Sequence, residues 1–168
     1  ADCVKLALRE LCEGTPELVV SGVNNGWNVG TDVHYSGTVG AAMEAAFEGL
    51  PAIAVSAKRP DAARYACAAQ HAVLLARRLL SHPLPMPSVL NVNIPDCEPE
   101  AIHGLVEAPM TPMRYTDTYD RMPHTRGRTA YWLSGDIVEE GCLSGGDLDR
   151  LMQGYATLTA LTWDWTLR

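Results

Sequence analysis

From residue 21 to residue 38 the chain reads Ser-Gly-Val-Asn-Asn-Gly-Trp-Asn-Val-Gly-Thr-Asp-Val-His-Tyr-Ser-Gly-Thr. This segment follows the apolar run Leu18-Val19-Val20 and leads into a helix-like segment, 37–48. A strand, a glycine-rich loop and a helix start, in that order, are typical of a phosphate site in an open α/β sheet. Glycines let the backbone approach the ligand, and the first N–H groups of the helix point at the anion. The segment therefore predicts an α/β fold with an anion site.

The flanking sequence repeats the pattern of apolar strands joined by helices. Asp2 and Gly14 are expected to bound a first helix, and strands are predicted at Ala52–Ser56 and Val89–Ile94. Asp61 is the predicted N-cap of a long helix that runs to about Leu80. The apolar stripe expected on that helix is Tyr65, Ala69, Val73, Ala76 and Leu80. Continuous apolar strands with intervening helices favour parallel βαβ units buried on both faces.

After Pro95 the sequence no longer shows the regular succession of apolar strands and helices. Residues 110–128 show no clear period and are predicted to form an arm or hairpin that continues into Thr129–Leu133. A short helix at Asp147–Gln153 and a last strand at Tyr155–Leu161 follow. The terminal rings of Trp163 and Trp165 suggest a tail that docks against another surface. We expect residues 1–96 and 97–168 to be two parts of one domain.

The composition of the 168-residue chain, with 47% apolar and 20% charged residues, is that of a globular domain. Its net charge of −7 argues against a nucleic-acid polymer as the main partner. No apolar run is long enough to span a membrane. The scattered cysteines without Cys-x-x-Cys spacing favour buried, reduced thiols in a cytoplasmic protein; they are Cys3, Cys12, Cys67, Cys97 and Cys142.

The segment that starts at Ser21 also resembles the signature of the SurE survival-protein family. The resemblance is carried by Ser-Gly-Val-Asn, by the spaced Gly26, Asn28 and Gly30, and by Tyr-Ser-Gly-Thr-Val ending at Val39. It continues through residues 49–56 and 90–95 and is weaker afterwards. The resemblance implies a three-layer α/β/α, Rossmann-like, mostly parallel sheet with a C-terminal hairpin or arm and a tail used in oligomerisation.

The same resemblance implies an activity, a cofactor and partners. SurE proteins are phosphomonoesterases that hydrolyse nucleoside 5′- and 3′-monophosphates and depend on a divalent metal, Mg²⁺ or Mn²⁺. We therefore expect a cytoplasmic 5′-nucleotidase that forms a homodimer or homotetramer and binds neither a nucleic-acid polymer nor a membrane. A nucleotide-binding Rossmann-type domain is the weaker hypothesis, because the sequence lacks the Gly-x-Gly-x-x-Gly motif of such domains.

The resemblance assigns roles to particular residues. Asn24 stands in the position of a metal ligand, and four residues stand where the family contacts phosphate: Asn28, Ser36, Gly37 and Thr38. From spacing alone, Asn24 fits a turn residue better than a metal ligand, and Ser36 fits a helix N-cap, a role that is compatible with phosphate contact. No general acid or base is assigned, although Asp32 and His34 are the nearby groups able to transfer protons.

Other polar residues receive a structural interpretation. Ser36 is rejected as a nucleophile because its context is not Gly-x-Ser-x-Gly. Glu44 is expected to support packing, and Asn91 and Asn93 are expected to cap a sheet edge. The basic residues of the arm either reach an anionic substrate or a partner subunit or form a solvated face; they are Arg114, Arg121, Arg126 and Arg128.

The chain departs from the family pattern in one respect. SurE proteins open with a strand and Asn-Asp-Asp-Gly, whose aspartates are the main metal ligands, and this chain contains no adjacent pair of aspartates. We expect a fragment, because a parallel sheet without its first strands exposes an unpaired edge. The alternative is a non-catalytic oligomeric or phosphate-binding remnant of the same fold.

Overall fold

The structure is a computed structural model that describes residues 2–58, 61–85, 87–124, 127–138 and 144–164. Three residues singled out above, Arg126, Cys142 and Trp165, lie outside these ranges. In chain order the elements are α1 (Asp2–Leu6), the π-helical turn η1 (Ala7–Leu11), β1 (Val19–Asn25), the 3₁₀ segment η2 (Gly30–Tyr35), α2 (Gly37–Phe47), β2 (Ala52–Ala57), α3 (Ala62–Ser81), β3 (Ser88–Ile94), the 3₁₀ turn η3 (Pro99–Ala101), β4 (Leu105–Glu107), β5 (Thr118–His124), β6 (Arg128–Ser134), α4 (Asp147–Met152) and β7 (Ala156–Thr162).

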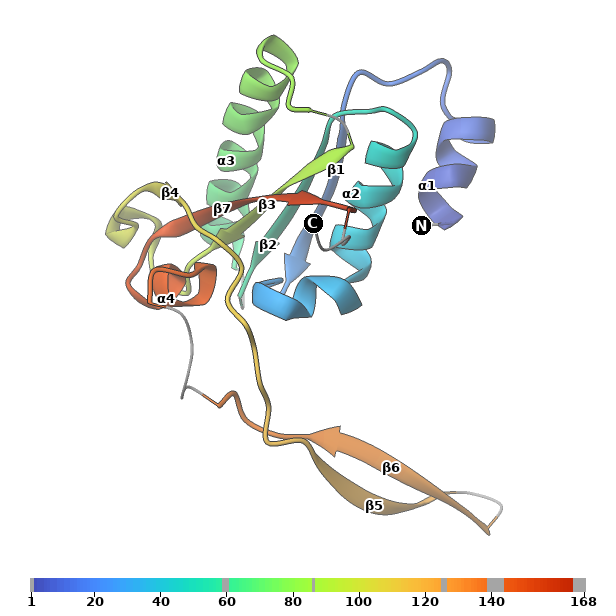
Figure 1. The fold of residues 1–168 in the computed structure, drawn as a ribbon, viewed down its shortest axis with the longest axis vertical. Helices are drawn as coiled ribbons and strands as arrows, with labels where there is room; N and C mark the ends of the chain where they lie inside the picture. The colour runs from blue at the N-terminus through green and yellow to red at the C-terminus, as the bar shows by residue number, and fades with distance from the viewer. Residues whose placement is uncertain (1, 59–60, 86, 125–126, 139–143, 165–168) are drawn as a thin grey trace.

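A five-stranded sheet in the order β1-β2-β3-β7-β4 forms the centre of the molecule. Strands β1, β2 and β3 are parallel, β7 runs antiparallel to β3, and the short β4 runs parallel to β7. Helix α2 covers one face of the sheet and α3 the other (Figure 1). The predicted three-layer, mostly parallel α/β fold is confirmed.

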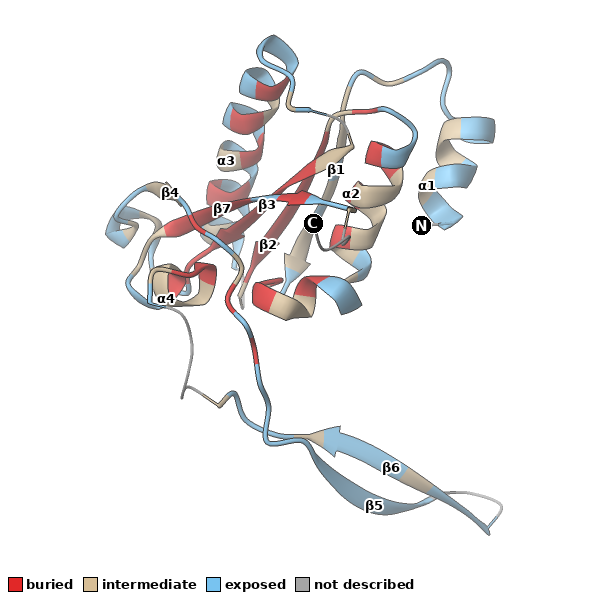
Figure 2. Cartoon of the chain, in the orientation of Figure 1, coloured by how far each residue is buried: buried red, intermediate tan, exposed pale blue. Residues whose placement is uncertain are grey.

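Strand β2 shows why the sequence favours this arrangement. All six of its residues are buried, because alternate side chains serve opposite layers. Ile53 and Val55 pack with α3, whereas Ala52 and Ala54 pack with α2. Figure 2 shows this buried band running through the central strands. An apolar run without polar alternation is the expected sequence of a strand covered on both faces.

Strand β1 is longer than predicted. The prediction ended it at Val20, but the strand continues to Asn25, with a register shift between Ser21 and Asn24. Gly22 does not mark a loop. A Cβ there would lie 2.2 Å from the carbonyl oxygen of Val55, so glycine lets β1 approach β2.

The apolar stripe predicted for α3 is wrong, although the helix and its Asp61 N-cap are confirmed. Tyr65, Val73 and Leu80 are 42%, 51% and 48% exposed. The buried face is formed by Cys67, Ala68, Ala72, Leu75 and Leu79. The helix is apolar around much of its circumference, and its small residues allow a closer approach to the sheet than the larger ones do.

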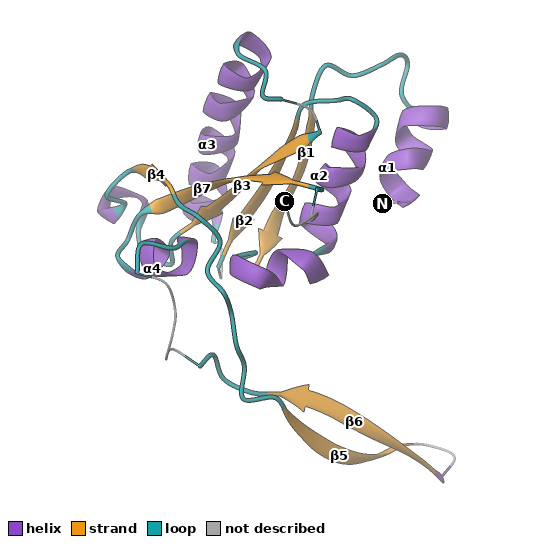
Figure 3. Ribbon diagram, viewed as in Figure 1, coloured by secondary structure: helices purple, strands orange, loops and turns teal. Residues whose placement is uncertain are grey.

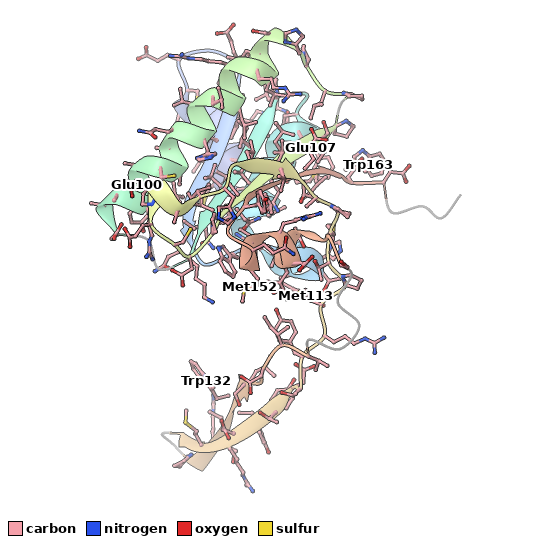
Figure 4. All side chains as sticks on the ribbon, turned by 90° about the vertical axis from the view of Figure 1, so that its left-hand side faces the viewer. Glu100, Glu107, Met113, Trp132, Met152 and Trp163 are labelled. Carbon is pink, nitrogen blue, oxygen red and sulfur yellow. The ribbon has the colours of Figure 1, made fainter. Side chains whose placement is uncertain are left out.

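The predicted hairpin is confirmed. Strands β5 and β6 form a separate two-stranded sheet, in which Thr118 pairs with Ser134 and His124 with Arg128. Loops carry this hairpin away from the sheet (Figure 3), and Trp132 lies on it at 66% exposure (Figure 4). The predicted short helix and last strand correspond to α4 and β7, and β7 inserts between β3 and β4.

The four described cysteines are free. Cys67 is buried as expected, but the prediction of buried thiols is wrong for Cys3 and Cys12, which lie exposed at the ends of the first helical segment. Burial raises the pKa of the Cys67 thiol, and it also raises the pKa of Cys97. Among the described residues, no helix is both long and apolar enough to cross a membrane.

Candidate functional site

The predicted site residues gather at the carboxyl edge of the parallel strands. This edge is the usual place for ligands in open α/β sheets. The loop that follows β1 is anchored there by Trp27, whose Nε1 donates to the carbonyl oxygen of Ile94 at 2.6 Å. The ammonium group of Lys58, just after β2, lies 4.6 Å from the centroid of the Trp27 ring. These contacts fix the loop across the ends of β2 and β3.

Asn28 is held by three buried side chains. Its backbone N–H donates to Asn93 Oδ1 at 2.8 Å, and its carbonyl oxygen accepts from Asn91 Nδ2 at 2.8 Å and from Asn93 Nδ2 at 3.0 Å. The amide of Asn28 itself donates to Ser56 Oγ at 2.6 Å. The expectation that Asn91 and Asn93 cap a sheet edge is wrong. They lie on the interior strand β3 and fix the backbone of the candidate site.

Asp147 is the residue that the sequence analysis missed. Its side chain is fully buried, and its Oδ2 accepts from the N–H of Gly30 at 2.7 Å. Its Oδ1 accepts from the backbone N–H groups of Thr111 and Leu148, each at 2.9 Å. Gly30 has a φ of +51°, and a Cβ there would lie 2.1 Å from the carbonyl oxygen of Thr111. Asp147 and this glycine together fix the start of η2.

The start of α2 presents unpaired backbone donors. Ser36 is the N-cap, because its Oγ accepts from the N–H of Val39 at 3.1 Å, as predicted. The N–H groups of Gly37 and Thr38 precede the first intrahelical bond and have no acceptor inside the helix. A Cβ placed at Gly37 would meet no atom within 4 Å. The protein thus leaves open space beside two free N–H groups at the positive end of a helix.

Asp32 connects this loop to the base of the hairpin. Its Oδ2 accepts a hydrogen bond from the hydroxyl of Tyr115. Burial, and then the neighbouring carboxylate of Asp32, raises the pKa of Tyr115 well above its ordinary value. A second link joins Thr31 Oγ1 to the backbone N–H of Met113 at 3.2 Å. The segment before α2 and the hairpin base therefore form one connected unit.

These elements enclose a cavity of about 710 Å³. It is lined by Trp27, Asn28, Asp32, Tyr35, Ser36, Tyr115, Asp117, Tyr119, Leu133, Ser134 and Gly135. Two of the residues expected to bind phosphate, Asn28 and Ser36, thus share one cavity. His34 lines a different cavity, beside Met43 and Leu161, so the structure does not place it with Asp32 as an acid–base pair.

Asn24 lies near the end of β1 and does not line that cavity. Its Nδ2 donates to the carbonyl oxygen of Gly26 at 2.9 Å, the contact of a turn asparagine, and this leaves Oδ1 as the atom able to bind a cation. The described residues contain no group of three or more His, Cys, Asp or Glu side chains with metal-site geometry. Glu44 forms a salt bridge with Lys5 at 3.1 Å, which confirms its structural role.

The geometry defines a class of protein: an α/β protein in which helix α2 begins, with two free backbone N–H groups, at the carboxyl edge of a mostly parallel sheet. Comparison with known families identifies the particular family. The model of the family described as Survival protein SurE matches residues 1–117. The chain belongs to the SurE family.

Individual relatives agree with this assignment. The chain is 42% identical to the 5′-nucleotidase SurE of Synechococcus sp. (strain JA-3-3Ab), over 99% of this chain and 64% of the relative. It is 41% identical to the 5′-nucleotidase SurE of Heliobacterium modesticaldum, over 99% of this chain and 61% of the relative. The crystal structure of the SurE protein from Aquifex aeolicus superposes with a TM-score of 0.79 at 34% identity, covering 98% of this chain and 67% of that one. The chain therefore spans somewhat less than two thirds of these curated relatives.

Proposed function

We propose that the protein is a metal-dependent phosphomonoesterase that hydrolyses nucleoside 5′- and 3′-monophosphates to nucleoside and phosphate in the cytoplasm. One observation carries the proposal. The capped start of α2 offers the N–H groups of Gly37 and Thr38 beside a cavity that Ser36 and Asn28 line. Similarity to proteins named 5′-nucleotidases supports the same reaction.

Phosphate binding is assigned to Asn28, Ser36, Gly37 and Thr38. The helix start supplies two N–H donors, and the positive end of the α2 dipole favours the negative charge of the phosphate. The hydroxyls of Ser36 and Thr38 add to these donors. The hydrogen bonds from Asn91 and Asn93 hold Asn28 in place before substrate arrives, so little ordering remains to be done on binding.

Asn24 is proposed as one ligand of a divalent cation, Mg²⁺ or Mn²⁺. Because its Nδ2 is bound to Gly26, its Oδ1 is oriented as the available hard oxygen donor. A single amide oxygen does not hold such a cation, so the described residues supply only part of the ligand set. A divalent cation bound there would neutralise charge on the phosphate oxygens.

A second copy of the chain is the proposed partner, in a homodimer or homotetramer. An isolated two-stranded hairpin is marginally stable in water. Met122 and Trp132 on this hairpin are 46% and 66% exposed. Near the C-terminus Trp163 packs edge-on against Phe47, with ring centroids 6.4 Å apart, yet both rings remain more than half exposed. These surfaces are the ones that an adjoining subunit would bury.

The activity test measures phosphate release from a nucleoside monophosphate with Mn²⁺ present and after exhaustive chelation. The proposal expects turnover that chelation abolishes. It also expects Gly37→Val to lower kcat/KM more than Ser36→Ala, because a branched side chain blocks the backbone donors, whereas one hydroxyl contributes about 1–3 kcal/mol. Turnover that survives chelation would contradict the metal assignment. Normal turnover in folded Gly37→Val, with Ser36→Ala inactive, would contradict the backbone site.

A further inference from the structure

The cavity at the base of the hairpin is larger than a phosphate group requires, and it is lined by side chains that a phosphate group alone would not need. Organic ligands typically occupy cavities of about 300–1,000 Å³ that combine apolar walls with a few polar groups, and this cavity measures about 710 Å³. Asn28 and Ser36 lie on its wall as the candidate phosphate contacts. The rest of the wall brings aromatic rings and two carboxylates from the hairpin and from η2. These groups match the other half of a nucleotide, its sugar and base.

The aromatic residues of the cavity differ in how far they are already engaged. Trp27 is bound through its Nε1 and carries Lys58 over its ring. The hydroxyl of Tyr115 donates to Asp32. Tyr119, on β5, is 65% exposed, and its side-chain hydroxyl makes no hydrogen bond to another described residue. Tyr35, on η2, is 90% exposed, and Tyr119 is the corresponding open ring on the hairpin side of the cavity. Aromatic rings stack on nucleobases of any sequence.

The carboxylates of Asp32 and Asp117 provide hydrogen-bond acceptors on the wall of this cavity. An ionised carboxylate has two oxygens, each able to accept hydrogen bonds from hydroxyl or amino groups. Asp32 uses Oδ2 for Tyr115, so Oδ1 stays available on the cavity wall. Asp117 lies on the same wall, two residues before Tyr119. Ribose hydroxyls are donors of the kind that these carboxylates accept.

We propose that this cavity binds the nucleoside part of the substrate, with Tyr119 stacking on the base and with Asp32 and Asp117 accepting hydrogen bonds from the ribose. The inference rests on the proposed function, since the phosphate contacts at Ser36 set the direction in which the nucleoside extends. It adds the selectivity of the site: nucleoside monophosphates bind better than phosphate esters without a base.

The test compares the Kd of adenosine 5′-monophosphate with that of ribose 5-phosphate, which keeps the sugar and phosphate but lacks the base. Titration calorimetry measures both, with Mg²⁺ present and without relying on turnover. Tyr119→Ala is expected to weaken adenosine 5′-monophosphate binding about tenfold and to leave ribose 5-phosphate unchanged. Tyr119→Phe keeps the ring and is expected to bind like the unmodified protein.

Tyr131→Ala is the matched control, because Tyr131 is also 65% exposed, lies on the same hairpin and does not line the cavity. It is expected to change neither Kd. Equal affinity of the unmodified protein for both ligands, no binding of either, or equal effects of Tyr119→Ala and Tyr131→Ala would overturn the inference.

Turnover separates this inference from the proposed function. Base-dependent binding through Tyr119 without hydrolysis in Mn²⁺ would leave the nucleoside site standing and reject the phosphatase activity. Hydrolysis of both phosphate esters, with Kd values that Tyr119→Ala does not alter, would reject the nucleoside site and retain the activity.

Discussion

Replacing Asp147 by asparagine removes the acceptor that holds the start of η2. The substitution leaves one oxygen and introduces an NH₂ group in a fully buried position. If the NH₂ takes the place of Oδ2, the N–H of Gly30 loses its acceptor, and two donors then face each other at the 2.7 Å contact. Each unsatisfied buried donor costs about 1–3 kcal/mol, so for two such donors we expect a loss of about 2–6 kcal/mol in the free energy of unfolding.

Asp149→Asn provides the comparison on the same helix. Asp149 accepts from the N–H of Gly145 at 2.6 Å and from Gln153 Nε2 at 2.9 Å, but it is only half-buried. Water can replace the lost contacts, so the expected cost is about 1 kcal/mol or less. Urea unfolding with linear extrapolation measures both variants. A loss below about 1 kcal/mol for Asp147→Asn, or equal losses for the two variants, would refute the reasoning, since single buried donors cost at least that much.

Three further outcomes follow from the same structure. Gly37→Ala and Gly40→Ala should each leave the melting temperature unchanged or raise it, because neither Cβ meets an atom within 4 Å and alanine favours helix by up to about 1 kcal/mol. Only Gly37→Ala should weaken phosphate binding in a calorimetric titration, and equal affinities would contradict the site. The hydroxyl of Tyr115 has a higher pKa in the folded than in the unfolded protein, so its stabilising contribution is fully present below about pH 10 and is lost at higher pH. The melting-temperature difference between the unmodified protein and Tyr115→Phe should therefore stay constant from about pH 6 to 9, and a steady decline across that range would argue against the assignment. Iodoacetamide at about pH 8 should label the exposed Cys12 before the buried Cys67, whose thiol pKa is raised, as peptide mass spectrometry would show; earlier labelling of Cys67 would contradict this.

The fold was predictable where the apolar pattern of a segment follows directly from its burial in the sheet. The apolar run at Ala52–Ser56 marks a strand covered on both faces, and the structure confirms it. The pattern failed for the face of α3, because alanines and larger apolar residues alternate around that helix and only packing distance chooses between them. It failed at Gly22 because a glycine that lets two strands approach looks the same in sequence as one that makes a turn.

The candidate site was predictable only in its local part. The cap at Ser36 depends on neighbours within one turn of helix, so the sequence reveals it. The support beneath the site depends on residues far apart in the chain. Asp147 lies 117 positions from Gly30, and Asn93 lies 65 positions from Asn28. No periodicity or spacing encodes such pairs, and these buried hydrogen bonds were found only in the folded structure.

The claim that the start of α2 binds the substrate phosphate is tested most directly by ¹H–¹⁵N NMR. The spectra record the backbone amides of the protein during titration with a nucleoside monophosphate and Mg²⁺. The account predicts saturable shifts that are largest at Gly37 and Thr38, whose N–H groups gain an anionic acceptor at the start of α2. Shifts centred on another surface, with both of these amides unmoved at saturation, would contradict the account.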